Sequence, residues 1–335
     1  MKISKFFFKN LFKIFWKFIN SSRVFINKYL PFNKENTKIF FGGAIGGNIG
    51  GPLVKIRKLK KNFPESKTKF NIVYLISNNV YIDGRSLKVL SKNNIPIILN
   101  QNGVYYPGWY KGNYKKRNLP LSERYHAADY VFWQSKFCKR ASDKFLGARN
   151  GEGEILYNSV DTKLFIPRKC FKQKFTFLIT GNVDKKNNYR IISVLEAFKE
   201  IVKSNKNIKL LIAGNIEDRN YLVNKTINLN LMNYVTFLGQ FSQLEAPSIY
   251  QLADAYITLT YQDNCPSAVI EAMSCGLPIL YSSSGGVPEL VDENSGIGLK
   301  VNENWESIQI PNLTKIIEGI YKIIEDKEIM SKSAR

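Results

Sequence analysis

The stretch YQDNCPSAVIEAMSCGLPILYSSSGGVPE, residues 261–289, contains the pattern that decides the fold. Pro266 stands where a helix would begin, because proline fits the first helical turn, and Asn264 and Cys265 before it are candidate caps. The apolar segment Pro278–Tyr281 has the length of a buried strand and runs into a glycine turn. A helix followed by a short buried strand is the repeating unit of a parallel α/β sheet.

The same alternation of short apolar segments and helix-length stretches extends through the chain. It predicts an α/β protein of two Rossmann-like, doubly wound domains that face each other across an interdomain cleft. The polar, proline-broken segment 158–174 separates them, so we expect domains at residues 36–165 and 166–335, after a separate segment 1–35. The expected strands are 38–41, 71–76, 95–99, 130–133, 175–180, 209–213, 235–238, 255–259 and 278–281; expected helices follow Pro52 and occupy 118–128 and 189–203.

The helix start after Pro266 carries the most specific chemical signal. The backbone N–H groups of Ser267, Ala268 and Val269 would point out of it, where the helix dipole favours a phosphate. Asp263 and Glu271 flank this start, and ionised carboxylates accept hydrogen bonds from hydroxyl groups rather than bind phosphate. A ligand with phosphate in its middle and hydroxyl groups at both ends is a nucleotide sugar.

The order of these residues resembles the retaining glycosyltransferases of family four, which have the GT-B fold. Their motif is an acidic residue, seven others and a Glu that opens E-A-M-A-x-G-x-P, followed later by G-G-x-P-E. Here Asp263 and Glu271 have that spacing, 272–278 reads AMSCGLP, and 285–289 reads GGVPE. Asn158–Asp161 resembles the N-G-V-D before the family's interdomain linker, and the likeness covers most of residues 38–335.

This resemblance implies an enzyme that moves a sugar from a nucleotide-sugar donor to a glycan or lipid-linked acceptor, with retention of anomeric configuration. No metal and no other cofactor is implied, and the place of such an enzyme is polysaccharide or lipopolysaccharide biosynthesis. By the family pattern, Glu271 would hold the nucleotide ribose. Asp263 replaces the more usual Glu, so its shorter reach leaves its role at the transferred sugar open.

The diphosphate-binding loop departs from the family pattern. Family members usually carry an Arg after the first glycine of the second domain and a Lys about five residues later. Here Asn182 stands in the Arg position, so the cation would come from a nearby Lys or Arg, of which we favour Lys186. The expected donor-side residues are Gly181, Asn182, Lys185, Lys186, Arg190, Gly214, Ser267, Ala268, Val269 and Glu271, with Asp263, Glu271 and Lys186 as the catalytic set.

The first domain supplies candidates for the acceptor side. The loop GGAIGGNIGG, residues 42–51, fits neither a dinucleotide fingerprint nor a P-loop, but Gly46 and Gly47 would allow a ligand to approach the backbone closely. Asn102 is a candidate to face the sugar, with a simple Asn-Gly turn as the alternative. The segment Tyr105–Arg117 mixes aromatic and cationic residues that would suit an acceptor sugar or a lipid headgroup.

The excess of basic over acidic residues lies entirely in the first half of the chain. Residues 1–168 contain 31 Lys and Arg against 9 Asp and Glu, whereas residues 169–335 contain 18 of each, so the whole net charge of +22 lies in the first half. Residues 1–30 interleave lysines with phenylalanines, without the roughly 20 apolar residues that a bilayer-spanning helix needs. We expect a basic amphipathic helix on an anionic membrane surface, in a cytoplasmic protein peripheral to the inner face of the membrane. The alternative is a helix docked on the first domain.

Other function classes receive less support. The chain has four Cys without a C-x-x-C pair, one His and no D-x-D triplet, which disfavours a zinc site, a disulfide framework and a metal-held diphosphate. Nucleic acid is not among the expected partners of such a transferase. The competing hypothesis is a non-catalytic basic protein that binds membrane or nucleic acid with a degenerate GT-B fold. A GT-B epimerase is a more distant alternative. The last residues, 330–335, resemble the start of the family's closing helices, which leaves a truncated second domain open.

Overall fold

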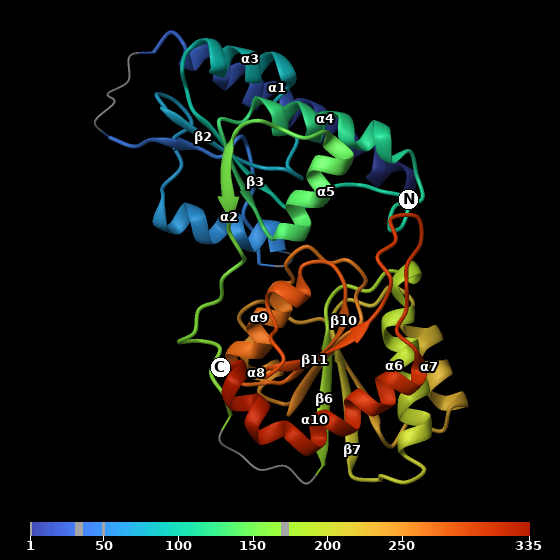
Figure 1. Ribbon diagram of the computed structural model, residues 1–335. Helices are drawn as coiled ribbons and strands as arrows, with labels where there is room; N and C mark the ends of the chain where they lie inside the picture. Colours follow the sequence, from blue (N-terminus) through green and yellow to red (C-terminus); the bar gives the residue numbers. More distant parts are fainter. Residues whose placement is uncertain (1, 31–35, 49–50, 169–173) are drawn as a thin grey trace. The chain divides into compact units, whose positions relative to one another are not determined.

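The computed structural model describes residues 2–30, 36–48, 51–168 and 174–335, with side chains from Leu11 onward. The chain forms two compact units, Met1–Tyr157 and Asn158–Arg335, each built on its own parallel sheet (Figure 1). The side chains of the expected lysines and phenylalanines before Leu11, and the end of the glycine-rich loop at 49–50, lie outside the part of the chain that the structure describes.

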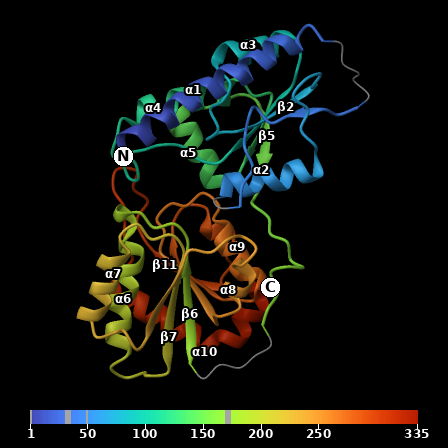
Figure 2. The ribbon, with the colours of Figure 1, turned by 180° about the vertical axis from the view of Figure 1, so that it is seen from behind.

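Unit 1 has a five-stranded parallel sheet in the order β1-β2-β3-β4-β5. Its helices α1, α3, α4 and α5 contact one another in that order and form a layer, whereas α2 lies apart from them (Figures 1 and 2). The strands are β1 (Ile39–Phe40), β2 (Ile72–Ile76), β3 (Ile97–Gln101), β4 (Tyr130–Trp133) and β5 (Glu152–Ile155). The helices are α1 (Lys2–Asn27), α2 (Gly51–Asn62), α3 (Gly84–Lys92), α4 (Tyr114–Ala127) and α5 (Lys136–Leu146).

Unit 2 has a six-stranded parallel sheet in the order β11-β10-β9-β6-β7-β8. Apolar cores cover both faces: α6, α7 and α10 contribute to one and α8 and α9 to the other, which is the layering expected when parallel strands are buried on both sides. The strands are β6 (Phe175–Thr180), β7 (Ile208–Ala213), β8 (Val235–Gly239), β9 (Ala255–Thr258), β10 (Ile279–Ser283) and β11 (Gly296–Lys300). The helices are η1 (Lys185–Asn187), α6 (Tyr189–Ile201), α7 (Arg219–Asn228), α8 (Ala246–Tyr250), α9 (Ser267–Ser274), η2 (Val287–Glu289) and α10 (Leu313–Ala334).

The strand order of unit 2 reverses at one point. The chain leaves β6 toward β7 and β8 and then returns to β9 on the other side of β6. Ligands of doubly wound sheets bind beyond the carboxyl ends of the strands at such a reversal. The loops after β6 and β9 are therefore the first place to look for a site. In unit 1 the strand order follows the chain, so this sheet has no corresponding reversal.

Residues 158–165, which the sequence analysis assigned to the first domain, belong to unit 2. Phe165 is buried in the core formed with α8 and α9, and its carbonyl oxygen accepts a 2.7 Å hydrogen bond from the Ser274 hydroxyl. Asn158 donates its side-chain amide to the carbonyl oxygen of Cys265 at 2.6 Å. These contacts connect residues more than 100 positions apart, so local polarity could not reveal them.

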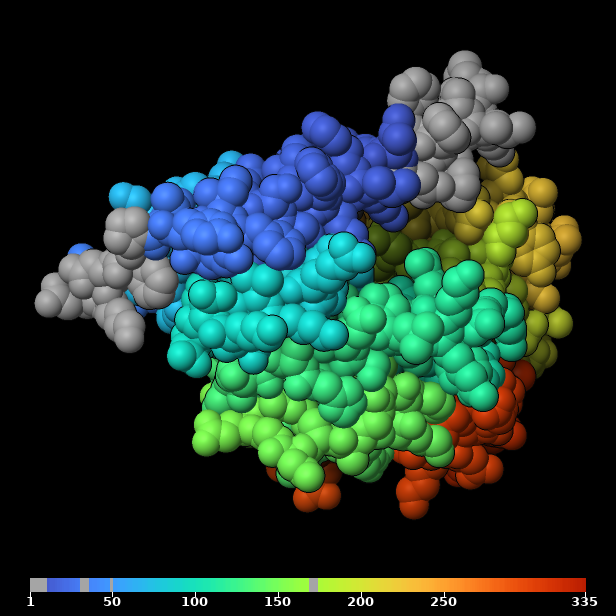
Figure 3. Space-filling view, turned by 90° about the horizontal axis from the view of Figure 1, so that it is seen from above, coloured from blue at the N-terminus to red at the C-terminus, as the bar shows by residue number. Residues whose placement is uncertain are grey.

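The second half of α1 is docked on unit 1. Trp16 donates its indole N–H to the carbonyl oxygen of Gly43 at 2.8 Å, and Val24 is buried. The fully buried Asn27 side chain exchanges hydrogen bonds of 2.9 and 3.0 Å with the backbone of Phe70. Figure 3 shows α1 lying beside α3 on this face of unit 1.

The opposite side of α1, between Leu11 and Phe18, instead faces solvent. Phe12, Phe15 and Phe18 are 53%, 60% and 68% exposed, and Leu11 and Ile14 are exposed beside them. The docked stripe and this exposed apolar stripe lie on different sides of one helix, as a 3.6-residue period requires. The helix therefore combines the docking that was the alternative expectation with an apolar face left open.

Candidate functional site

The loops after β6 and β7 lie so close together that their backbones are in contact at Gly181 and Gly214. Gly181 and Gly214 follow these strands with φ values of +125° and +131°, in the region that side chains rarely adopt. A Cβ on Gly214 would lie 2.0 Å from the carbonyl oxygen of Gly181, which no side chain tolerates. At this end of the strands, a ligand would therefore contact main-chain atoms rather than side chains.

The loop after β9, residues 261–265, is held from three sides. Tyr261 donates its backbone N–H to the Tyr189 hydroxyl oxygen at 3.0 Å, and Gln262 donates its own to the Ser284 hydroxyl oxygen at 3.0 Å. The carbonyl oxygen of Asp263 accepts the N–H of Gly286 at 2.7 Å. These contacts fix Asp263 at the end of β9, next to the point where the strand order reverses.

The G-G-x-P-E segment packs closely against the backbone of Asp263. Gly285 has a φ of +68°, and a Cβ on it would lie 2.3 Å from the Asp263 carbonyl oxygen. Gly285 and Gly286 therefore help to hold the backbone of Asp263 in place. The sequence motif at residues 285–289 identified these glycines, but it did not predict that they contact the 261–265 loop.

The start of α9 differs in two details from the sequence expectation. Its N-cap is Pro266, whose side chain cannot accept a hydrogen bond, rather than Asn264 or Cys265. Val269 donates its N–H to the carbonyl oxygen of Pro266 at 3.1 Å, so this amide is not free as expected. Within the part of the chain that the structure describes, the N–H groups of Ser267 and Ala268 have no backbone or side-chain acceptor. Two N–H groups therefore remain for an anion.

Asp263 is a partly buried carboxyl group beside a cation. Burial raises the pKa of Asp263, while Arg190 and the backbone N–H groups of Cys265 and Asn264 lower it, leaving it above the ordinary value. A carboxyl group with such opposing influences at a strand end is typical of a functional site.

Of the three candidate cations, Arg190 lies closest to the site. It stands in the first turn of α6 and donates to the carbonyl oxygen of Thr180 at 3.4 Å. Its buried Nε has no hydrogen-bond partner among the residues that the structure describes. Lys185 and Lys186 are exposed and pair with Asp218 at 3.9 Å and Asp184 at 3.7 Å, respectively. Asn182, in the usual Arg position, is exposed.

Glu271 lies on α9 and is held by two side chains. Gln243 donates its amide N–H to Oε1 at 2.8 Å, and the buried Tyr250 donates its hydroxyl to Oε2 at 3.0 Å. Neither partner was expected from the sequence, because they stand 28 and 21 residues before Glu271 on a loop and on α8.

Buried polar atoms without a partner gather around the same loops. Among the described residues they include atoms of Asp184, Asn188, Arg190, Gln262 and Asn264. Each such atom costs free energy in a folded protein unless water or a ligand satisfies it. The cluster marks the loops after β6 and β9 as a polar site.

Unit 1 brings together a smaller polar group. Asn102, just after β3, donates its backbone N–H to the Ser77 hydroxyl oxygen at 3.0 Å, and its side-chain oxygen accepts from Gln134 at 2.8 Å. The buried Nδ2 of Asn102 has no partner in the structure. Gly46 is exposed, and Gly47 donates its N–H to the Leu53 carbonyl oxygen at 3.0 Å.

The family model described as Glycosyl transferases group 1 matches residues 162–334, more than half of the chain. The chain belongs to this family. The match confirms the resemblance seen in the sequence, and it covers all of the unit 2 residues that form the site described above.

Relatives of this group 1 family member include characterised and uncharacterised proteins. An uncharacterized glycosyltransferase of Methanocaldococcus jannaschii is 28% identical over 63% of this chain and 50% of its own length, so the chain spans half of that relative. The UDP-Gal:alpha-D-GlcNAc-diphosphoundecaprenol alpha-1,3-galactosyltransferase of Escherichia coli is 24% identical over 90% of this chain and 79% of its own length.

Among solved structures, HepE of Anabaena in complex with UDP matches with a TM-score of 0.61 and 16% identity, covering 85% of this chain and 76% of that chain. At this identity the likeness shows the fold alone. Together with the two parallel sheets, it confirms that the family member has the expected GT-B fold.

A pocket of about 580 Å³ lies beside the candidate site of this group 1 protein. Neither Asp263 nor Glu271 lines it. Its lining includes Lys185, Tyr189, Asp218, Tyr221, Ile310, Pro311, Leu313 and Ile316. The loops at the strand reversal instead carry Asp263, and the unpartnered polar atoms of residues 184–190 and 262–264 belong to the same loops. Glu271 lies further along α9, which begins directly after the second of these loops.

The described residues contain no group of three or more His, Cys, Asp or Glu side chains that could hold a metal ion. None of the helices that the structure describes combines the length and hydrophobicity that a bilayer-spanning helix requires.

Proposed function

We propose that the protein is a glycosyltransferase that moves a sugar from a nucleotide-sugar donor to a glycan or lipid-linked acceptor with retention of anomeric configuration. One observation carries the proposal: Asp263 and Glu271 stand on either side of a helix start with two available N–H groups, at the reversal of the unit 2 sheet. Membership of the group 1 family and the UDP complex of a protein with the same fold support it.

The donor fits this site in one orientation. The N–H groups of Ser267 and Ala268 and the dipole of α9 stabilise the diphosphate, with the backbone of Gly181 and Gly214 close by. Glu271 accepts hydrogen bonds from the ribose diol. Asp263, on the other side of the helix start, lies at the transferred sugar.

In the reaction, the bond between the anomeric carbon and the phosphate oxygen breaks, and the acceptor oxygen bonds to the same face of that carbon. The acceptor proton passes to a donor phosphate oxygen, so no protein base is needed. The α9 amides and a cation of the 185–190 loop stabilise the departing nucleoside diphosphate, which is the electrostatic role that a metal ion plays in other transferases.

We propose Arg190 as that cation, because it lies beside Asp263 with an unpartnered Nε, whereas Lys186 is exposed and paired with Asp184. Arg190→Gln is expected to lower kcat/KM about 10²-fold, the usual effect of removing one transition-state donor, while Lys186→Gln changes it less than about threefold. Because Arg190 lowers the pKa of Asp263, its loss raises that pKa, and the acidic limb of the pH–rate profile moves to higher pH.

Initial rates of both variants between pH 5 and 9 measure these effects. A larger loss in Lys186→Gln than in Arg190→Gln would assign the cation to Lys186, as the loop spacing favoured, and would reject Arg190.

The acceptor belongs on unit 1 in this proposal. After β3, Tyr105 stacks on the exposed Trp109 with ring centroids 5.2 Å apart, and Arg117 lies 5.4 Å from the Tyr105 ring. Aromatic rings and cations suit a sugar joined to a phosphorylated lipid, and the acceptor in the name of the Escherichia coli relative is such a compound. Gly46, Gly47 and Asn102 are the further acceptor-side candidates.

We also propose that the exposed stripe of α1 rests on an anionic membrane, which would make the protein cytoplasmic and peripheral to the inner face. The stripe consists of Leu11, Phe12, Ile14, Phe15 and Phe18. Lys13 and Lys17 alternate with these residues in the sequence; Lys13 is exposed, whereas Lys17 is partly buried and lies near Asp83. Aromatic rings in the acyl boundary with ammonium groups near lipid phosphates are the pattern of interfacial helices.

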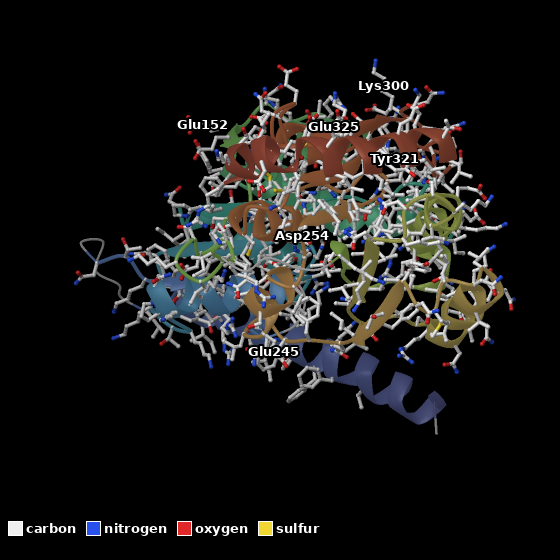
Figure 4. All side chains as sticks on the ribbon, turned by 90° about the horizontal axis from the view of Figure 1, so that it is seen from below. Glu152, Glu245, Asp254, Lys300, Tyr321 and Glu325 are labelled. Atoms are coloured by element: carbon white, nitrogen blue, oxygen red, sulfur yellow. The ribbon has the colours of Figure 1, made fainter. Side chains whose placement is uncertain are left out.

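A donor screen tests the central proposal. We expect wild-type protein to release nucleoside diphosphate from one or a few members of a panel of UDP-, GDP-, ADP- and dTDP-sugars, measured by mass spectrometry. Glu271→Gln should lower that rate at least about tenfold, because a hydrogen bond to a charged group is lost, and Glu325→Gln should not change it. Glu325 is an exposed acid on α10 and undergoes the same change of charge (Figure 4).

Equal turnover by wild type and Glu271→Gln would contradict the assignment. Tight, salt-dependent binding of an oligonucleotide without any binding of nucleotide sugars would point to the competing, non-catalytic hypothesis.

A further inference from the structure

Glu271 is the end of a chain of buried hydroxyl groups. Tyr250 donates to Glu271 at 3.0 Å, its oxygen lies 3.3 Å from the Thr180 hydroxyl, and that hydroxyl lies 2.9 Å from the Tyr256 hydroxyl. All three hydroxyl residues are almost completely buried, and they come from α8, β6 and β9. The chain therefore runs from the centre of the unit 2 sheet to the first turns of α9.

The direction of donation in this chain is determined by its end. An ionised carboxylate can only accept, so the Tyr250 proton points to Glu271, and the Tyr250 oxygen is left to accept from Thr180. The Thr180 oxygen then accepts from Tyr256. Burial and the neighbouring Glu271 raise the pKa of Tyr250 well above its ordinary value, so its hydroxyl remains a donor over the working pH range.

These bonds hold the Glu271 carboxylate in one orientation. Tyr250 donates to Oε2 and Gln243 donates to Oε1, so each carboxylate oxygen is fixed by a side chain from another element. A carboxylate held in this way binds the diol without first losing side-chain freedom.

We propose that Tyr250 is a positioning residue that orients Glu271 to receive the two ribose hydroxyl groups of the nucleotide. The inference rests on the proposed function, because it gives Glu271 the ribose as its ligand. It adds a residue that touches no part of the donor and acts only through the carboxylate.

The experiment compares Tyr250→Phe with Tyr256→Phe in the full chain. Both variants lose one hydroxyl from the same core, but only Tyr250 contacts Glu271. We expect Tyr250→Phe to raise the Kd for UDP, measured by calorimetry, about 5- to 20-fold, since a hydrogen bond to a charged group is lost, and Tyr256→Phe to change it less than about twofold. The Kd for 2′-deoxy-UDP, which lacks one of the two hydroxyl groups, should respond much less to Tyr250→Phe.

A double-mutant cycle separates positioning from general damage. If Tyr250 acts through Glu271, adding Tyr250→Phe to Glu271→Gln leaves the Kd close to that of Glu271→Gln alone. Gln243→Leu, at a partly exposed position, provides a second variant that keeps the core intact and should raise the Kd about 2- to 5-fold through the loss of one hydrogen bond.

Two results would overturn the inference in distinguishable ways. A folded Tyr250→Phe protein, or a Gln243→Leu protein, with wild-type Kd values would reject the positioning role and leave the proposed function standing. A wild-type protein that binds no UDP, GDP, ADP or dTDP would reject the proposed function and, with it, the ligand that Tyr250 is said to serve.

Discussion

Asp263→Asn is expected to lower donor turnover by about 10²- to 10³-fold, the effect of losing one preorganised charge at a reacting centre. Asparagine has the same size, and its side-chain oxygen can still accept the backbone N–H groups of Asn264 and Cys265. The loop therefore keeps its conformation while the negative charge disappears. Because Asp263 is assigned to the sugar rather than the nucleotide, the Kd for UDP should change less than about threefold, well below the effect of losing a charged hydrogen bond.

The same substitution should not lower stability at neutral pH. Burial raises the folded-state pKa of Asp263, so its ionisation opposes folding, and stability falls as the pH rises through that value. Asp263→Asn removes this opposition. Its free energy of unfolding should equal or exceed that of wild type at pH 7, and the difference should vanish below the unfolded-state pKa of aspartate, which is about 4.

Asp254→Asn provides the matched control. Asp254 stands at the amino end of β9, at the other edge of the sheet, and accepts the Thr176 N–H at 2.9 Å (Figure 4). Its variant should lose stability and keep its turnover number. Denaturant unfolding and initial rates on both proteins measure the contrast, and an Asp263→Asn enzyme with near wild-type kcat would remove Asp263 from the catalytic set.

Phe12→Ser/Phe15→Ser/Phe18→Ser is expected to weaken binding to anionic vesicles about 10²-fold. Each ring is more than half exposed on the protein, and its transfer to the acyl boundary contributes on the order of 1 kcal/mol, about half of full burial. Vesicles of 70% phosphatidylcholine and 30% phosphatidylglycerol, sedimented with the protein, measure the partition coefficient. Unit 1 should keep its fold, because the docked stripe with Trp16, Val24 and Asn27 is unchanged.

Two further variants separate the electrostatic from the apolar contribution to vesicle binding. Lys13→Gln should weaken it about fivefold on the anionic vesicles and have no effect on pure phosphatidylcholine, because each lysine near an anionic surface contributes about 1 kcal/mol. Leu244→Ser/Ile329→Ser removes exposed apolar side chains elsewhere in the chain and should bind as wild type does. Equal sedimentation of the triple variant and wild type would refute the membrane role of α1.

The features predicted correctly from the sequence are those encoded locally. The spacing of Asp263 and Glu271 around a proline that starts a helix needs only neighbouring residues, and the short apolar runs correspond to strands of the two sheets. By contrast, the place of Arg190 beside Asp263 depends on the pairing of β6 with β9, which lie about 80 residues apart in the chain. Loop spacing, which favoured Lys186, contains no information about that pairing, and our proposal of Arg190 rests on it.

Polar side chains with buried partners were also invisible to pattern analysis. Asn20 and Asn27 are buried on the docked side of α1 although they are polar. Asn27 satisfies the Phe70 backbone, and Asn20 donates to the Trp16 carbonyl oxygen one turn earlier in the same helix. Hydrophobic periodicity assigns such residues to solvent. Tyr250 and Gln243 were missed for the same reason, since their role is defined by Glu271 in another element.

The docking of α1 has a practical consequence for producing this protein. Deleting an N-terminal membrane-binding helix is a common way to make a membrane-associated enzyme easier to purify, and in this protein the deletion would end before Pro31. Here it would strip the Asn27 side chain from the buried N–H and C=O of Phe70 and the Trp16 indole from the carbonyl oxygen of Gly43. Such shortened material would aggregate more, not less, so solubility should be sought by polar replacements on the outer side of the helix.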